Sequence, residues 1–343
     1  VPGLVGIVCE PFIGLLGDTR HRKVLVMGGI FATVAGLLCI ALGQTFALIL
    51  IAFSVMGTAS GAYVNLAQAT LIDLNPRRAE HTMARWVLMG AIGVMVSPLV
   101  ATAAFYLGYG WRGLYLALAG AAGAYVALLW RQKYDTHNGA GEETISPRKL
   151  LRSLFEALRN RQLLKWILLT ELADFMLDKL LEVTGLYFHD VAGVSFAAAS
   201  AAVALFTIAG LIGNALLVPT LEKVSGLRVL RVTAVVVLAA YFAFLTVPVI
   251  WIKYALIAVI SFSTAGWFST LRAKCFQVLP GQSGLIIAAT SLGNISGLFV
   301  PLIVGRVADA FGLQWAMWLL AVGPLALVLG LPERTADQAN SAD

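Results

Sequence analysis

The chain has 343 residues, of which 59% are hydrophobic and 12% are charged, and its formal net charge is +6 at pH 7. Because an ordinary soluble domain has about 25% charged residues, this composition excludes a typical water-soluble globular protein. The basic residues form no aromatic-interleaved module, so we expect the positive charge to serve a membrane surface and not nucleic acid. Cys9, Cys39 and Cys275 stand singly in apolar stretches, which argues against disulfides and a metal site.

Apolar segments long enough to cross a bilayer recur along the whole chain. A spanning helix needs roughly 20 apolar residues, and breaks at proline, glycine and charge clusters divide the chain into eleven such segments. The sequence therefore predicts an all-α polytopic membrane protein. The spans are expected near residues 1–16, 24–43, 46–71, 86–107, 113–130, 166–188, 197–219, 229–248, 252–271, 283–304 and 314–331.

The distribution of basic residues orients these spans. If the first span ends in the cytoplasm and each later span alternates, twenty of the 24 basic residues fall on the cytoplasmic side. Arg112, Lys253 and Arg306 fall outside, and Lys179 lies within a span. The positive-inside rule predicts this bias, which holds only if segment 166–188 crosses the membrane. We expect a multi-pass protein of the cell (inner or plasma) membrane with a cytoplasmic linker and C-terminus.

Segment 166–188 carries charge although its length and hydropathy suit a bilayer. At about 100° per residue, its acids fall within an arc of about 80°: Glu171, Asp174, Asp178 and Glu182. Each ionised group at bilayer depth costs at least roughly 2.5–3.5 kcal/mol, so this stripe must face a wet cavity or share protons. Lys179 lies one turn from Glu182 and is expected to neutralise that acid or Asp178.

Two interpretations of the acidic stripe remain open. Burial and mutual repulsion favour the protonated form of clustered carboxyl groups, so the stripe is a candidate proton, cation or substrate site centred on Asp174 and Asp178. The alternative is a set of internal salt bridges that only holds helix packing. Glu171 is then a gate residue paired with Arg272 or Lys274, which otherwise mark the inner end of their own helix.

Glu10 is the other acid expected inside a span. It lies two turns before Asp18, about 12 Å inside the cytoplasmic end of the first span. With Pro11 beside it, Glu10 is expected either to exchange protons or to bond a backbone group that the proline frees.

The sequence repeats itself at a spacing near 204 residues. Asp18 aligns with Glu222, and Pro76 aligns with Pro280. Parallel repeats of this size are typical of two helical bundles related by an axis along the membrane normal. We expect an N-terminal bundle over 1–130, a cytoplasmic linker over 131–165 with a short amphipathic helix after Pro147, a C-terminal bundle over 166–331 and a cytoplasmic tail over 332–343.

The acidic segment has no counterpart in the first repeat. We therefore expect a twelve-helix fold whose first helix the given sequence lacks; a native eleven-helix fold is the alternative.

The loop after the first span carries the most specific motif. Its sequence, Gly14-Leu-Leu-Gly-Asp18-Thr-Arg-His-Arg22-Lys23, resembles the motif G-x-L-A-D-[RK]-x-G-[RK]-[RK] of the major facilitator superfamily of secondary transporters, although two positions depart from it. The resemblance implies that Gly14 permits close helix approach and that a helix N-terminus or an arginine answers the charge of Asp18, a gating residue. It also implies that Arg22 and Lys23 are cytoplasmic anchors.

Two weaker matches support the resemblance. The segment from Asp73 to Arg78 is similar to the polar end of the family's fourth helix. Gly90, Gly93 and Pro98 are similar to a signature in the fifth helix of antiporters, where small residues allow tight packing and the proline bends the helix. The fourth-helix motif R-x-x-x-G is broken, because Phe53 occupies the arginine position.

The resemblance implies a secondary active transporter that moves a small molecule across the bilayer by alternating access, as a monomer without a cofactor or metal. Proton coupling through segment 166–188 and efflux of a cationic or amphipathic compound are expected, while sugars and other metabolites stay open as substrates. Two other classes stay open, a transporter-like ligand sensor and a polytopic membrane enzyme. The four histidines are scattered over loops, so no catalytic constellation supports an enzyme.

Overall fold

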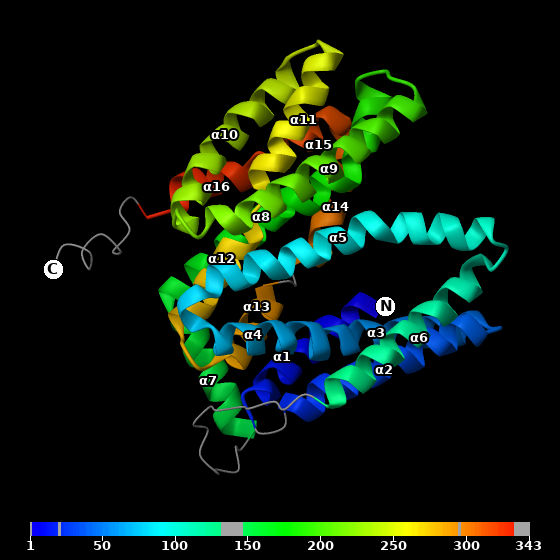
Figure 1. Cartoon of the computed structure of the whole chain (residues 1–343). Coiled ribbons are helices and arrows are strands. Elements are labelled where there is room, and N and C mark those ends of the chain that lie inside the picture. Colours follow the sequence, from blue (N-terminus) through cyan, green and yellow to red (C-terminus); the bar gives the residue numbers. More distant parts are fainter. Residues whose placement is uncertain (1, 20–21, 132–146, 294–295, 333–343) are drawn as a thin grey trace. The chain divides into compact units, whose positions relative to one another are not determined.

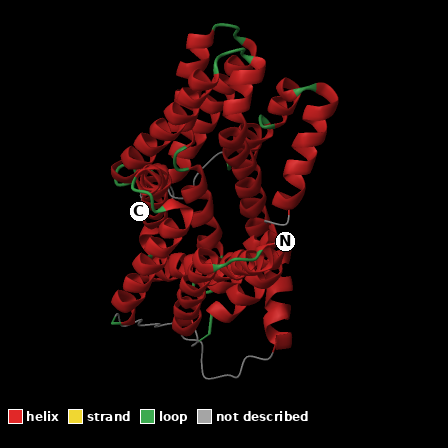
Figure 2. Cartoon of the chain, turned by 90° about the vertical axis from the view of Figure 1, so that its right-hand side faces the viewer, coloured by secondary structure: helices red, strands yellow, loops and turns green. Residues whose placement is uncertain are grey.

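The computed structural model describes residues 2–19, 22–131, 147–293 and 296–332. Within these residues every regular element is a helix and no strand is present, as Figure 2 shows. The predicted all-α fold is therefore confirmed. Much of the predicted linker, 132–146, and the predicted tail after residue 332 lie outside the described residues.

The chain divides into two compact units, and each is described by itself. Unit 1 comprises Val1–Ala79, Gly93–Leu164 and Cys275–Ile295, and unit 2 comprises Glu80–Ile92, Lys165–Lys274 and Ser296–Asp343. In chain order (Figure 1) the helices are α1 (Pro2–Gly17), α2 (Arg22–Leu42), α3 (Phe46–Ser60), η1 (Gly61–Asn65), α4 (Leu66–Leu74), η2 (Pro76–Arg78), α5 (Ala79–Tyr106), α6 (Gly110–Trp130), α7 (Pro147–Arg159), α8 (Arg161–Leu186), η3 (Tyr187–Val191), α9 (Phe196–Thr220), α10 (Gly226–Thr246), α11 (Ile250–Thr264), α12 (Trp267–Val278), α13 (Ser283–Gly293), α14 (Ser296–Phe311), α15 (Leu313–Leu319) and α16 (Val322–Gly330).

Eight helical stretches in the described part of the chain are long and apolar enough to cross a membrane by length and composition. They are Arg22–Leu42, Phe46–Leu74, Pro76–Tyr106, Gly110–Trp130, Phe196–Thr220, Gly226–Thr246, Ile250–Val278 and Leu313–Gly330, and each coincides with an expected span. The other three expected spans are also helical. Of these, α1 is short, α8 carries the acidic stripe, and α13 is separated from α14 by residues 294–295, which are not described.

Local signals set the helix ends that matter for the site. Asn160 lies between α7 and α8, and its Oδ1 accepts hydrogen bonds from the backbone N–H groups of Gln162 at 2.9 Å and Leu163 at 3.2 Å. Such a side chain satisfies N–H groups that the first helical turn leaves unpaired, so α8 begins directly after α7. Gly266 separates α11 from α12 with a φ of 90°, a left-handed conformation that glycine adopts without steric cost.

In unit 1, α2 packs against α3 and α6, while α1 packs against α3 and α13. The close approach of α1 to α13 occurs at Gly14. A Cβ atom on this glycine would lie 2.7 Å from the backbone N of Ala288 and 2.9 Å from the carbonyl O of Gly284. The close helix approach predicted at Gly14 is therefore confirmed.

In unit 2, α11 packs against α9 and α10, and α10 packs against α16. Helix α8 approaches α16 at Gly323, where a Cβ atom would lie 2.8 Å from the carbonyl O of Leu172. The fully buried residues of α8 near this point are Ala173, Met176 and Leu180, which recur on one helical face. Packing thus occupies one side of α8 and determines which way its acids point.

The α1–α13 contact predicts opposite effects for two glycine substitutions. Gly14→Ala should lower the thermal stability of the purified chain in detergent, because overpacking costs about 1–3 kcal/mol. Gly28→Ala in α2 is the matched control, since a Cβ atom there meets nothing within 4 Å. This second change should leave stability equal or raise it by about 0.5–1 kcal/mol, the cost of a glycine inside a helix. Shifts in the same direction for both variants would contradict the packing.

Candidate functional site

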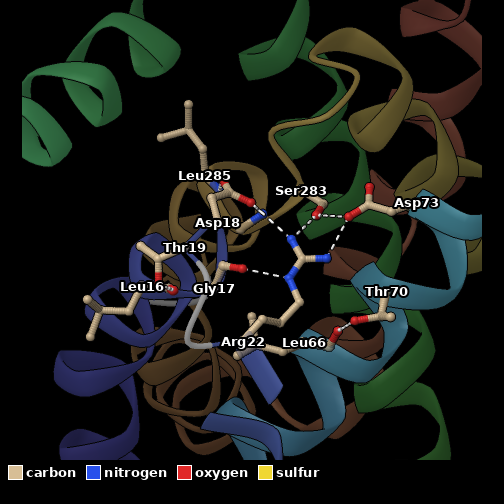
Figure 3. A network of polar contacts seen from close by, with 11 residues as sticks. Leu16, Gly17, Asp18, Thr19, Arg22, Leu66, Thr70, Asp73, Ser283 and Leu285 are labelled. Atoms are coloured by element: carbon tan, nitrogen blue, oxygen red, sulfur yellow. Dashed lines mark hydrogen bonds and ion pairs between the residues drawn. The ribbon is translucent and has the colours of Figure 1, made fainter. Parts of the chain in front are cut away.

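A buried arginine lies at the centre of the polar network in Figure 3. Arg22, the first residue of α2, is 3% exposed. Its Nε donates to the carbonyl O of Gly17 at 2.6 Å, and its Nη1 donates to Asp73 at 2.6 Å. Its Nη2 donates to Asp18 at 3.1 Å and to the hydroxyl of Ser283 at 2.8 Å, and that hydroxyl donates to Asp73 at 2.6 Å. We call Asp18, Arg22, Asp73 and Ser283 the Arg22 network.

Asp18 also caps the N-terminus of α13. Its two carboxylate oxygens accept hydrogen bonds from the backbone N–H groups of Gly284 at 2.6 Å and Leu285 at 2.7 Å. These N–H groups have no partner within a helix, and the helix dipole favours a negative charge beside them. Burial raises the pKa of the Asp18 carboxyl, while the two N–H groups and Arg22 act in the opposite direction. The N-terminus of α13 and Arg22 both stabilise the negative charge of Asp18, as the motif predicts.

The predicted role of Arg22 as a cytoplasmic anchor is wrong, because its guanidinium is buried. Two acids reach it, Asp18 at the end of α1 and Asp73 near the end of α4. A planar guanidinium with five N–H donors suits several acceptors at once, which explains why the side chain turns inward. Lys23, the next residue, stays partly exposed.

A second charged cluster lies in unit 2 around Glu80, near the start of α5. One carboxylate oxygen of Glu80 lies 2.9 Å from Nζ of Lys274 in α12. The other accepts a hydrogen bond at 2.9 Å from the backbone N–H of Gly226, the first residue of α10. Nearby, Nε2 of His81 lies 3.6 Å from a carboxylate oxygen of Glu222. We call Glu80, Lys274 and Gly226 the Glu80 cluster.

Sequence reasoning missed the Glu80 cluster, although the repeat contained the signal. A spacing of 204 residues pairs Asp18 with Glu222 and Gly284 with Glu80. In the Arg22 network the acid of the loop caps the helix of the other repeat. In the Glu80 cluster the acid stands at the position that corresponds to Gly284. It accepts a hydrogen bond from the first residue of α10, the helix that follows the loop of Glu222. The two clusters thus occupy corresponding positions of the repeat, but the carboxylate and the backbone N–H group that it binds have exchanged sides.

The acids of α8 lie on the face opposite to its packed face. Asp178 and Glu182 are exposed, and Glu171 and Asp174 are partly buried. Asp174 is close enough to Asp178, Glu171 and Arg272 to interact electrostatically with all three. The predicted pairing of Lys179 with Glu182 is confirmed at 2.6 Å. The structure therefore brings two further acids and one arginine close to Asp174.

Glu10 lies elsewhere, in unit 1, and is partly buried. It packs against Gly61, the first residue of the π-helical turn η1, where an added Cβ atom would meet the side chain of Glu10. Turns of this kind occur frequently at functional sites, so Glu10 remains a candidate residue for proton exchange.

Lys253, which the charge distribution assigns to the outer side of the membrane, is only 6% exposed. Its Nζ donates to the hydroxyl of Tyr187 at 2.8 Å and to the carbonyl O of Phe244. It also lies 5.1 Å from the centroid of each of these two rings, within cation–π range. Because Tyr187 begins η3 directly after α8, this contact fixes the end of the acidic helix.

The tight packing predicted for Gly90 and Gly93 is absent in the described part of the chain. A Cβ atom at either glycine would meet no other atom within 4 Å, and both residues are exposed. Pro98 lies inside α5 without ending it. Among the described residues, no group of three or more His, Cys, Asp or Glu side chains is arranged to hold a metal ion.

Removal of the buried guanidinium predicts a large loss of stability. Arg22→Ala leaves Asp18 and Asp73 without their cation, which should lower the unfolding free energy by up to about 3–5 kcal/mol. Lys23→Ala, one residue away, should change it by about 0.5 kcal/mol or less. Thermal unfolding in detergent measures both variants. Equal losses would show that burial of Arg22 contributes nothing.

Comparison with known proteins places this arrangement in a family. The chain matches the family model described as Major Facilitator Superfamily over residues 1–297. It is similar to the crystal structure of the E. coli fucose:proton symporter FucP, with a TM-score of 0.83 and 13% identity, over 96% of this chain and 88% of that chain. It is also similar to the human organic anion transporter MFSD10 (TETRAN), with a TM-score of 0.80 and 16% identity, over 96% of this chain and 82% of that chain.

No curated protein sequence matches the chain. The identities to the solved structures are low, so those likenesses show the fold alone. The family model, however, covers most of the 343 residues. The protein therefore belongs to the major facilitator superfamily of multi-pass membrane transporters.

Proposed function

We propose that the protein is a proton-coupled secondary transporter that moves a small molecule by alternating access. The observation that carries this proposal is the acidic face of α8, where Asp174 interacts with Asp178, Glu171 and Arg272 and faces away from the packed side of the helix. Acids inside membrane helices commonly mark ion pathways and proton relays. The similarity of the fold to a structure named as a fucose:proton symporter supports the coupling.

Arg272 supplies a counter-charge for the ionised form of Asp174. Protonation of this carboxyl group weakens its attraction to Arg272, and release of the proton restores that attraction. The four acids of α8 outnumber the two nearby cations, Lys179 and Arg272, and this excess of negative charge attracts cations. We accordingly propose efflux of a cationic or amphipathic compound, with Asp174 and Asp178 as carriers of the proton.

The Arg22 network and the Glu80 cluster form the proposed cytoplasmic gate. Each joins a segment of the expected N-terminal bundle, 1–130, to a helix of the expected C-terminal bundle, 166–331. Asp18 holds the start of α13, and Glu80 holds the start of α10 together with Lys274. Alternating access rocks one bundle against the other, so both contacts break when the cytoplasmic side opens.

We place the protein in the cell membrane as a monomer, with the linker 131–165 and the C-terminal tail in the cytoplasm. The asymmetric distribution of the basic residues supports this orientation. A transporter-like sensor that binds a ligand without moving it is the competing proposal, because the same acidic face can bind a cation in either protein.

Neutralising the acids of α8 predicts a loss of coupling. In proteoliposomes, Asp174→Asn and Asp178→Asn should abolish flux of tetraphenylphosphonium driven by a pH gradient, because neither variant can exchange a proton at that position. Glu182→Gln is the matched control, since this exposed side chain is paired with Lys179, and it should retain the flux. Unchanged elution from a sizing column would show that the variants still fold.

Three outcomes separate the proposals. Wild-type gradient-driven flux in both Asp variants would overturn the assigned carriers. Binding of tetraphenylphosphonium by the wild-type chain without any flux would favour the sensor. Flux of another compound from a panel of sugars and organic anions, with the same loss in the variants, would retain the coupling site and replace the substrate class.

Weakening the gate predicts exposure of a buried cysteine. Cys275 follows Lys274 in α12 and is fully buried. With Cys9 and Cys39 changed to serine, Glu80→Gln should speed labelling of Cys275 by an impermeant thiol reagent from the cytoplasmic face by at least about tenfold, since breaking a buried ion pair costs about 3–5 kcal/mol. Glu222→Gln, which removes an exposed acid, should change the rate little. Equal rates in all variants would contradict the gate.

A further inference from the structure

Helix α7 offers an apolar surface that the described part of the chain leaves largely exposed. The amphipathic helix predicted after Pro147 is confirmed as Pro147–Arg159, and it packs against α13 in unit 1. Leu154 and Ala157 are buried. Leu151 and Phe155, in contrast, are 42% and 67% exposed. The helix thus has one apolar strip that is buried, Leu154 and Ala157, and a second that is exposed, Leu151 and Phe155.

The order of side chains around α7 is typical of a helix at a membrane surface. At about 100° per residue, Leu154 and Ala157 lie about 60° and 120° to one side of Leu151. On its other side, Phe155 follows at about 40°, then Arg159 at about 80° and Arg152 at about 100°. Basic residues next to an exposed Leu and Phe pair place their charges at the level of lipid head groups while the apolar side chains enter the acyl boundary.

The positive charge of α7 indicates what kind of surface its exposed face binds. The helix contains four basic residues and one acid, Glu156, which pairs with Arg152 at 2.8 Å. A second copy of α7 would bring the same basic arc against itself, which like-charge repulsion opposes. Anionic phospholipid supplies the opposite charge, worth about 1 kcal/mol for each Lys or Arg near the surface.

The position of α7 in the chain brings it to the bilayer. It ends at Arg159, and the expected span of α8 begins at residue 166, about 10 Å further on at 1.5 Å per residue. Only Asn160 separates the two helices, so the C-terminal end of α7, which carries Phe155 and Arg159, stays close to the start of that span. The lipid head groups are therefore the nearest anionic surface to its basic arc.

We infer that the Leu151–Phe155 face of α7 lies on the inner surface of the membrane and binds anionic phospholipid through Arg152 and Arg159. The buried residues of α7, Leu154 and Ala157, lie to one side of this face, and α7 packs on α13, whose first turn is held by Asp18. Lipid binding to α7 would therefore act on α13, the helix that the Arg22 network also holds. The lipid contact stands without transport, and only its effect on the gate rests on the proposed function.

The experiment uses the full chain with its three cysteines changed to serine and one new cysteine, Phe155→Cys or Glu156→Cys, carrying a polarity-sensitive fluorophore. The chain is reconstituted in phosphatidylcholine vesicles, with or without phosphatidylglycerol. The label at 155 should shift its emission to the blue and lose most of its intensity to a lipid-borne quencher, more so with phosphatidylglycerol. The label at 156, on the charged side of the helix, should stay in water. Adding Arg152→Gln and Arg159→Gln should remove the response to phosphatidylglycerol at 155.

Either of two results would overturn the inference. One is a label at 155 that is as water-exposed as the label at 156 in both kinds of vesicle. The other is a label at 155 that is shielded equally in detergent and resists the lipid quencher, since another protein segment or a second copy would then cover the face. Neither readout requires flux, so failure here is distinct from failure of the proposed transport.

Discussion

An ionised side chain in a membrane protein is stable only where polar groups of the same protein surround it, because lipid tails offer none. Arg22 meets this requirement with acceptors from the ends of three helices, namely the carbonyl O of Gly17, Asp73 and Ser283, and with Asp18 from the adjoining loop. Residues that are 261 positions apart in the sequence thus share one guanidinium. The position of α1 relative to α13, and with it the packing at Gly14, depends on that shared charge.

The two repeats satisfy the same requirement in different ways. In one, the loop acid Asp18 reaches the start of α13, and an arginine on its own side completes the set. In the other, Glu80 at the start of a helix reaches the start of α10, and Lys274 completes the set. Both arrangements place a carboxylate where a helix dipole favours it. The repeat therefore preserves the physical contact although it exchanges the residues that make it.

Features that depend on one helix or on neighbouring residues could be predicted from the sequence. The eleven spans that hydropathy predicts are helical in the described residues, and helical spacing predicts the pair of Lys179 with Glu182 and the amphipathic α7. Partners distant in sequence could not be predicted in this way. The burial of Arg22 needs Asp73 and Ser283, and the burial of Lys253 needs Tyr187 and Phe244, and no local pattern pairs them. The motif glycines Gly90 and Gly93 show the converse, because a pattern that suits close packing meets open space.

The contact of Asp18 with α13 has a consequence for how the chain tolerates change. Both of its bonds come from main-chain N–H groups, so the identity of the side chain at Leu285 carries no information for recognition. Gly284 differs, since an added methyl group would collide with the carbonyl of Gly14. If Asp18 loses its carboxylate, no change of side chain at Gly284 or Leu285 can restore the contact by reversing a charge, because the donors there belong to the main chain. Compensation for such a lesion depends instead on the side chains of the network, which are Arg22, Asp73 and, on α13, Ser283.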